Sequence, residues 1–282
     1  MIIDFHTHTF PDAIAPKALK KLQGASHTRA FSDATVGALQ ADMAARGIDY
    51  SVVLPVATNA AKVPHMNDSS AALNTGGSLI HFGAMHPDFD GWYAELGRIQ
   101  ELGLKGIKIH PVYQDVDIDD IRYLRILERC AELDLIVVAH SGDDIGFPGV
   151  VRCDPARSRN ALRQVPGVKL VLAHMGGWKN WEQVAENLAD TGCYLDTAFS
   201  LGQIDAMEAS FYSEEERCLM SDEEFTALIK AFGADRVLFG TDSPWTNSQT
   251  EIRRILRLPG LTEEEKTAIL GGNAGKLLNI GC

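Results

Sequence analysis

Histidines at the ends of β-rich runs are the residues of this chain with the clearest chemical potential. His6 and His8 flank one threonine in the segment DFHTH, so on a strand both imidazoles point to the same face. Neutral imidazole nitrogens are good ligands for Zn²⁺ and similar divalent ions. The spacing therefore predicts a metal site at the end of the first strand.

Further apolar runs end in residues of the same chemical kind. His140 follows LIVVA, His174 follows LVLA, and Asp242 follows VLFGT. His86 and His110 also end β-rich runs. Because active-site residues of parallel barrels come from the carboxyl ends of several strands, we expect these side chains to meet at one face.

These runs are the strands of a repeating pattern that must position the histidines. The sequence predicts eight strands, over 2–8, 50–56, 79–86, 106–110, 135–140, 170–174, 194–197 and 237–241. Amphipathic segments predict helices over 120–133, 181–188, 222–232, 251–256 and 263–278. The alternation predicts a parallel α/β fold, specifically a (β/α)8 TIM barrel that forms one domain over 1–282. An open doubly wound sheet is the main alternative, although it normally has fewer strands.

Two connections, 142–155 and 200–221, are longer than the rest. In a barrel, the loops that follow strands build the active-site face. The second connection carries Met207, Phe211 and Tyr212 beside three glutamates. It is either a lid over the substrate or a surface excursion with a short solvated helix.

The charge of the chain excludes several classes of partner. Lys and Arg total 26 and Asp and Glu total 38, giving a net charge of −12. This argues against nucleic acid and against an anionic membrane surface as partners.

The sequence contains no phosphate-binding glycine motif, so it does not indicate a nucleotide cofactor. Five cysteines without CxxC spacing, and no signal-peptide pattern at the start, make a reducing cytoplasm the expected location.

The motifs together resemble the amidohydrolase superfamily, in particular the amidohydrolase-related branch that includes aminocarboxymuconate semialdehyde decarboxylase-like proteins. The matching segments are DFHTH, GIKIHP, HSG, AHMGG and GTDSP, in the strand order of the superfamily. The resemblance implies a divalent metal, Zn²⁺ first and Mn²⁺ as the alternative, with one or two ions per chain. The implied ligands are His6, His8, His140 and Asp242.

The resemblance also implies catalytic roles for three residues. Asp242 would hold the metal-bound water and take its proton. His174 would be a ligand of a second metal or a catalytic acid/base. Lys108 has three interpretations: a carboxylated bridge between two metals, a cation that binds a substrate carboxylate, or a structural ion pair with Asp4 or another acidic group inside the barrel.

A further group of residues is expected to bind a small anionic substrate. His110 shares a strand face with the lysine of GIKIHP, and His86 either lines the pocket or caps its strand. Arg152 could meet an anionic substrate or remain a solvated surface residue. Trp178, like Trp245, could stack on a flat substrate or pack a helix against the barrel.

The most direct interpretation is a metal-dependent hydrolase acting on an amide, lactone or ester bond of a small carboxylated molecule. The short chain and the GIKIHP segment favour it. The alternative is a metal-dependent lyase, a decarboxylase or hydratase, because that branch uses the same ligands for both reactions. A metal-binding protein without turnover and a nuclease are disfavoured by the intact ligand set and by the acidic charge. A homodimer is the commonest assembly of soluble proteins, and the sequence does not decide it.

Overall fold

The computed structural model describes residues 1–281, which form two compact units. The first unit comprises Met1–Ser51, Ile145–Pro148 and the chain from Thr197 onward. The second comprises Val52–Asp144 and Gly149–Asp196. Within the described residues, no helix combines the length and the apolar character that a membrane span requires.

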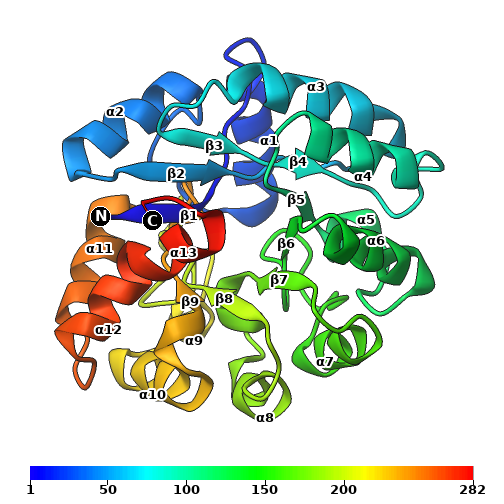
Figure 1. Ribbon diagram of the computed structural model, residues 1–282. Helices are drawn as coiled ribbons and strands as arrows, with labels where there is room; N and C mark the ends of the chain where they lie inside the picture. Colours follow the sequence, from blue (N-terminus) through cyan, green and yellow to red (C-terminus); the bar gives the residue numbers. More distant parts are fainter. Residues whose placement is uncertain (282) are drawn as a thin grey trace. The chain divides into compact units, whose positions relative to one another are not determined.

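The first unit combines short strands with helices from both ends of the chain (Figure 1). Its strands are β1 (Ile3–Thr7), β9 (Val237–Leu238) and the start of β2 (Tyr50–Val53). Its α-helices are α1 (Ala15–Ser26), α2 (Val36–Arg46), α9 (Glu214–Arg217), α10 (Asp222–Phe232), α11 (Ser248–Arg257), α12 (Glu263–Thr267) and α13 (Asn273–Leu278). A 3₁₀ turn, Ala234–Arg236, precedes β9, and a π-helical segment, Ala268–Gly272, joins α12 to α13.

The second unit alternates strands and helices. Its strands are the end of β2, then β3 (Leu79–His81), β4 (Gly83–Ala84), β5 (Gly106–Ile109), β6 (Ile136–Ala139), β7 (Lys169–Leu172) and β8 (Tyr194–Asp196). Its α-helices are α3 (Val63–Leu73), α4 (Trp92–Glu101), α5 (Pro111–Gln114), α6 (Ile121–Glu132), α7 (Pro155–Gln164) and α8 (Val184–Leu188). Three 3₁₀ turns are Ala60–Lys62, His174–Gly176 and Trp181–Gln183.

Strands β4 to β8 pair in sequence order, and the pairs β4–β5, β5–β6, β6–β7 and β7–β8 are parallel. Ile109 pairs with Ala139, and Ala139 pairs with Leu172. The strand residues are almost all buried, as expected for parallel strands covered on both faces. This register brings the residues that follow β5, β6 and β7 to one edge of the sheet.

Two of the predicted helices, 120–133 and 222–232, are confirmed to within one residue at each end. Each begins at a residue whose side chain caps the first helical turn. Asp120 accepts a hydrogen bond from the Arg122 amide at 2.9 Å and starts α6. Ser221 and Glu224 form a capping box at the start of α10. Caps of this kind satisfy backbone amides that the first helical turn leaves without partners.

The prediction of one strand over 79–86 is wrong. The chain there forms β3 and β4, separated by the buried Phe82. The amide of Ala84 donates to the Asn67 side chain at 2.7 Å, and the amide of Phe82 donates to the Val53 carbonyl. A side chain from α3 therefore takes the place of a strand partner and ends the ladder.

The prediction of one continuous helix over 263–278 is also wrong. The π-helical segment interrupts it, and there the Ile269 carbonyl accepts a hydrogen bond from the Phe239 amide at 2.9 Å. A Cβ added at Gly271 would lie 2.5 Å from the Met1 carbonyl oxygen. The helix changes its pitch where the chain before β1 and the end of β9 approach it.

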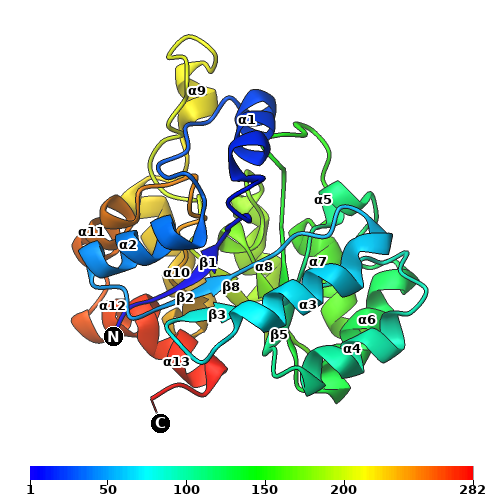
Figure 2. The same ribbon diagram turned by 90° about the horizontal axis from the view of Figure 1, so that it is seen from above.

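The long excursion 200–221 is fastened to the segment that follows α1 (Figure 2). Thr28 and Ala206 form an antiparallel bridge, and the rings of His27 and Phe211 stack with centroids 3.5 Å apart. Farther along the same segment, the Phe31 amide donates to the Pro244 carbonyl at 2.8 Å. The excursion contains the short exposed helix α9, as one of the two interpretations expected; a lid role stays a prediction.

Gln114 joins four parts of the second unit. Its Nε2 donates to the carbonyls of Ala57 and Met85, both at 2.7 Å. Its Oε1 accepts from the His110 amide at 3.0 Å and from the Tyr123 hydroxyl at 2.5 Å. The side chain is buried, and its amide makes two donor and two acceptor contacts.

We expect Gln114→Ala to lower the free energy of unfolding by about 3 kcal/mol, because it leaves buried donors and acceptors without partners. Gln100→Ala is the matched control, since Gln100 is exposed and its side chain donates one hydrogen bond, to the Leu133 carbonyl. Its effect should stay within about 0.5 kcal/mol. Urea denaturation of both variants measures the difference, and equal losses would contradict the structural role of Gln114.

Candidate functional site

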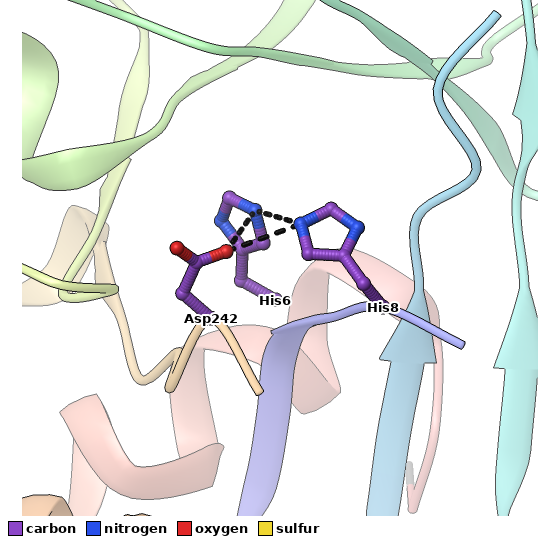
Figure 3. A group of neighbouring side chains, drawn as sticks. All are labelled: His6, His8 and Asp242. Carbon is purple, nitrogen blue, oxygen red and sulfur yellow. Dashed lines mark hydrogen bonds and ion pairs between the residues drawn. The ribbon is translucent and has the colours of Figure 1, made fainter. Parts of the chain in front are cut away.

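His6, His8 and Asp242 form a compact cluster in the first unit (Figure 3). The Nε2 atoms of the two histidines lie 3.2 Å apart. Oδ1 of Asp242 lies 3.4 Å from His6 Nε2 and 3.1 Å from His8 Nε2. His6 is fully buried, whereas His8 and Asp242 keep part of their side chains exposed. One face of the cluster is therefore open to a ligand.

The buried carboxylate of Asp4 holds the two chain segments of this cluster together. Its Oδ1 accepts from the Thr241 amide at 2.9 Å, and its Oδ2 accepts from the Thr241 hydroxyl at 2.6 Å. The same carboxylate lies 3.3 Å from the His6 amide. In addition, the Asp242 amide donates to the His6 carbonyl at 2.8 Å. These bonds set β1 directly beside the segment that carries Asp242.

The backbone at Gly240 and Asp242 also helps to position the side chains of the cluster. A Cβ added at Gly240 would lie 2.8 Å from the His6 Cβ, so a larger residue there would push β1 away. Asp242 has a φ of 57°, in the left-handed region that non-glycine residues seldom occupy. This turn directs the aspartate back toward the histidines, and such strained positions gather at functional sites.

The donor set of the cluster fits a divalent metal ion. Two imidazole nitrogens 3.2 Å apart would repel each other through their lone pairs unless a proton or a cation lies between them. Ligands about 2.0–2.1 Å from a tetrahedral Zn²⁺ lie about 3.4 Å from one another. The three edges of the cluster, 3.1 to 3.4 Å, are of that size. Two imidazoles and one carboxylate are also ligands that Mn²⁺ accepts.

A second cluster lies in the second unit, at the edge where β5, β6 and β7 end. The rings of His110 and His140 stack with centroids 4.1 Å apart and an interplanar angle of 12°. His174 Nε2 lies 3.0 Å from His140 Nδ1. Oδ2 of Asp144 lies 3.5 Å from His110 Nε2 and 3.6 Å from His140 Nε2. His110, His140 and Asp144 also form a group whose ligand atoms could surround a cation.

The sheet register explains why these side chains meet. His110 and His140 each follow a strand residue of the pair Ile109–Ala139, so they sit side by side. After His140 the chain turns at Gly142, where an added Cβ would lie 2.1 Å from the Trp178 amide nitrogen. The close approach of two backbones at Gly142 fixes the path of the following residues, which include Asp144.

Burial controls the charge of this second cluster. Desolvation lowers the pKa of His140 well below its usual range, and the electrostatic influence of His110, His174 and Lys108 acts in the same direction. Lys108 is only 1% exposed. Burial therefore favours the neutral form of the His140 imidazole.

The remaining predicted residues have local partners. His86 Nδ1 accepts a hydrogen bond from the Asp88 amide at 3.1 Å, and burial lowers the pKa of His86. Arg152 contacts Asp115 and Asp117, at 2.5 and 3.2 Å. Trp178 is 7% exposed. Roles of these three residues in substrate binding stay predictions.

Of the predicted metal ligands, the first unit brings together His6, His8 and Asp242, and His140 lies in the second unit. The sequence analysis missed Asp144, which is 5% exposed. Its signal was the pair of carboxylates that directly follows HSG. It also missed the positioning role of Asp4, which was considered only as a partner of Lys108.

We expect the double variant His6→Ala/His8→Ala to lose bound metal, because it removes both nitrogen donors of the first cluster. Elemental analysis of protein purified without chelator measures this loss. His65→Ala, at an exposed position of α3, is the control and should keep the metal content of the wild type. Metal retained in full by the double variant would contradict the ligand assignment.

The sequence model of a family described as amidohydrolase matches residues 3–280. No curated protein matches the sequence.

Solved structures resemble the chain over nearly its whole length. An uncharacterised Tim-barrel protein from Bordetella bronchiseptica is 19% identical, with a TM-score of 0.76 and coverage of 99% of this chain and 98% of that chain. A 5-carboxyvanillate decarboxylase from Sphingomonas paucimobilis is 16% identical, with a TM-score of 0.70 and coverage of 99% of both chains. A dihydroxybenzoic acid decarboxylase from a Polaromonas species, solved with bound manganese, is 17% identical, with a TM-score of 0.66 and coverage of 99% and 96%.

The structural likeness shows the fold, and it agrees with the predicted parallel α/β TIM-barrel class. The family match is independent of that likeness and extends from β1 to the end of α13, so it includes His6, His8 and Asp242. The chain belongs to the amidohydrolase family.

Proposed function

We propose that this protein is a metal-dependent lyase that decarboxylates a small aromatic or muconate-like acid. The observation that carries the proposal is the cluster of His6, His8 and Asp242, which offers a divalent metal three ligands and one open face. Its support is the fold, which the chain shares over 99% of its length with a carboxyvanillate decarboxylase and a dihydroxybenzoic acid decarboxylase.

A divalent ion in this cluster would supply a Lewis acid that binds the oxygen atoms of an anionic substrate. His6 and His8 contribute neutral donors, and Asp242 contributes one negative charge. The set therefore leaves a doubly charged ion with net positive charge, which favours a carboxylate or phenolate ligand. Zn²⁺ remains the first expectation for the ion, and the manganese bound to the Polaromonas enzyme supports the alternative, Mn²⁺.

Decarboxylation breaks the bond between the carboxylate carbon and the carbon that carries it. The carboxylate leaves as CO2, the electron pair of that bond stays on the substrate carbon, and a proton then adds there. We assign this proton transfer to His174, because imidazole is the side chain best suited to transfer protons near neutral pH. The balance requires one proton for each CO2 and no oxidant or reductant.

Lys108 is assigned to binding the substrate carboxylate. Its ammonium group lies within the buried strand β5, and its charge acts on His140. A cation in such a low-dielectric environment attracts an anion more strongly than one in water. This assignment takes the second of the three interpretations offered by the sequence.

Hydrolysis, which the sequence analysis favoured, is not confirmed. The description of the family agrees with it, but both named enzymes that share the fold are decarboxylases. The proposal therefore follows the alternative. A hydrolase would need the same metal cluster, so only the products of turnover separate the two reactions.

The test is a substrate panel assayed with protein loaded with Zn²⁺ or with Mn²⁺. The panel contains dihydroxybenzoates, carboxylated methoxyphenols and muconate-like dicarboxylates, together with lactones, esters and amides of similar size. We expect one CO2 released for each product molecule with at least one acid of the first group. Asp242→Asn should lower that rate by ~100-fold or more, because it removes the charged ligand.

Release of acid from a lactone, ester or amide without CO2 would contradict decarboxylation and restore the hydrolase interpretation. His65→Ala again serves as the control, and its turnover should equal that of the wild type.

A further inference from the structure

A groove of about 920 Å³ lies in the first unit, between α1 and the tip of the long excursion. The tip is residues 205–216. Ala15, Leu19 and Met207 give the groove apolar lining, and Lys20 and Glu208 give it charged lining. One side of the groove therefore comes from α1, and another comes from a segment almost two hundred residues further along the chain.

Backbone hydrogen bonds join the tip to the end of α1 (Figure 2). The Met207 amide donates to the His27 carbonyl at 2.8 Å, and the Arg29 amide donates to the Asp205 carbonyl at 2.7 Å. The side-chain amide of Gln23 also donates to the Met207 sulfur at 3.5 Å. The two walls are thus fixed before anything binds, and a preformed surface loses little conformational freedom when a partner docks.

Exposed apolar side chains gather around this groove. Ile14 is 51% exposed, Met207 50% and Phe211 47%. Ile14 directly precedes Ala15 in the groove lining, and the Phe211 ring stacks on His27, which also lines the groove. Large apolar side chains that are exposed together at one place mark an interaction surface.

The two walls carry charges of opposite sign. Helix α1 contains three exposed lysines and no acidic residue: Lys17, Lys20 and Lys21. The tip contains five acidic residues and no lysine or arginine: Asp205, Glu208, Glu214, Glu215 and Glu216. A two-fold axis that runs along the groove would place the α1 wall of one copy opposite the tip of another. The surface is therefore complementary in charge to its own copy.

We propose that this groove is the interface of a homodimer, in which α1 of each protomer packs against the tip of the other. Lys20 of one copy pairs with Glu208 of the other, once on each side of the two-fold axis. The apolar side chains are buried between these two pairs. At a net charge of −12 two copies repel each other at a distance, so their association requires local pairing of this kind.

The first experiment measures the sedimentation of the full chain as wild type, Lys20→Glu and Glu208→Lys. The wild type should sediment as a dimer over a concentration series. Each single variant sets like charges against each other at both contacts of the dimer. We therefore expect its dimer Kd to rise at least ~10-fold, because like charges that meet across an interface are unfavourable.

Mixing the two variants separates a contact between copies from a contact within one copy. The Lys20→Glu chain is acidic at both positions, and the Glu208→Lys chain is basic at both. In a mixed dimer both contacts join opposite charges, so the equimolar mixture should recover a Kd within about threefold of the wild type. Mixing cannot restore a contact that lies within one chain.

The second experiment tests the apolar part of the interface with Ile14→Asp. Ile14 is the N-cap of α1, where aspartate is a favoured residue, so the helix should still form. We expect the dimer Kd to rise at least ~10-fold, because the interface would bury a carboxylate without a partner. Ile121→Asp is the matched control: Ile121 starts α6 in the second unit, is 72% exposed, and its replacement should leave the Kd unchanged.

A wild type that stays monomeric up to ~100 µM would overturn the proposal, whether the groove then binds another protein or a small molecule. A dimer that is equally stable in Lys20→Glu and Ile14→Asp would overturn it too, because that dimer would form through another surface. So would a mixture of the charge variants that fails to recover. Because these readouts use neither a metal nor a substrate, the dimer and the proposed decarboxylation can fail separately.

Discussion

The carboxylate of Asp4 is the constraint on which the cluster of His6, His8 and Asp242 depends. It accepts hydrogen bonds from both the amide and the hydroxyl of Thr241, across 237 positions of sequence. A buried carboxylate is costly unless it is fully hydrogen-bonded, so the two segments have little freedom to separate. His6 and Asp242 lie next to these anchors. Their meeting therefore follows from a bond that takes no part in the chemistry.

The two clusters are assembled by different physical means. In the first unit, side-chain and main-chain bonds join segments from opposite ends of the chain. In the second unit, the sheet register brings the residues together, since pairing Ile109 with Ala139 places His110 beside His140. In the first arrangement His8 and Asp242 stay partly exposed, whereas the three histidines of the second are all buried.

Much of the fold and part of the site could be predicted because they depend on local pattern. Apolar runs ending in histidine marked the strands, and capping residues such as Asp120 marked helix ends. The break between β3 and β4 could not be predicted, because it depends on Asn67 reaching the Ala84 amide. Asp144 was missed for a similar reason. Its contact with the histidines depends on the turn at Gly142, which is set by the distant backbone of Trp178.

The attachment of the excursion 200–221 has a consequence for how relatives of this protein can diverge. The excursion is pinned to Thr28, and the same segment is bonded through Phe31 to Pro244, two residues beyond Asp242. A change in the length of the excursion would be transmitted as a small backbone displacement toward the metal cluster. Insertions or deletions in this surface loop could therefore shift the position of Asp242 during evolution, while His6, His8 and Asp242 themselves are unchanged.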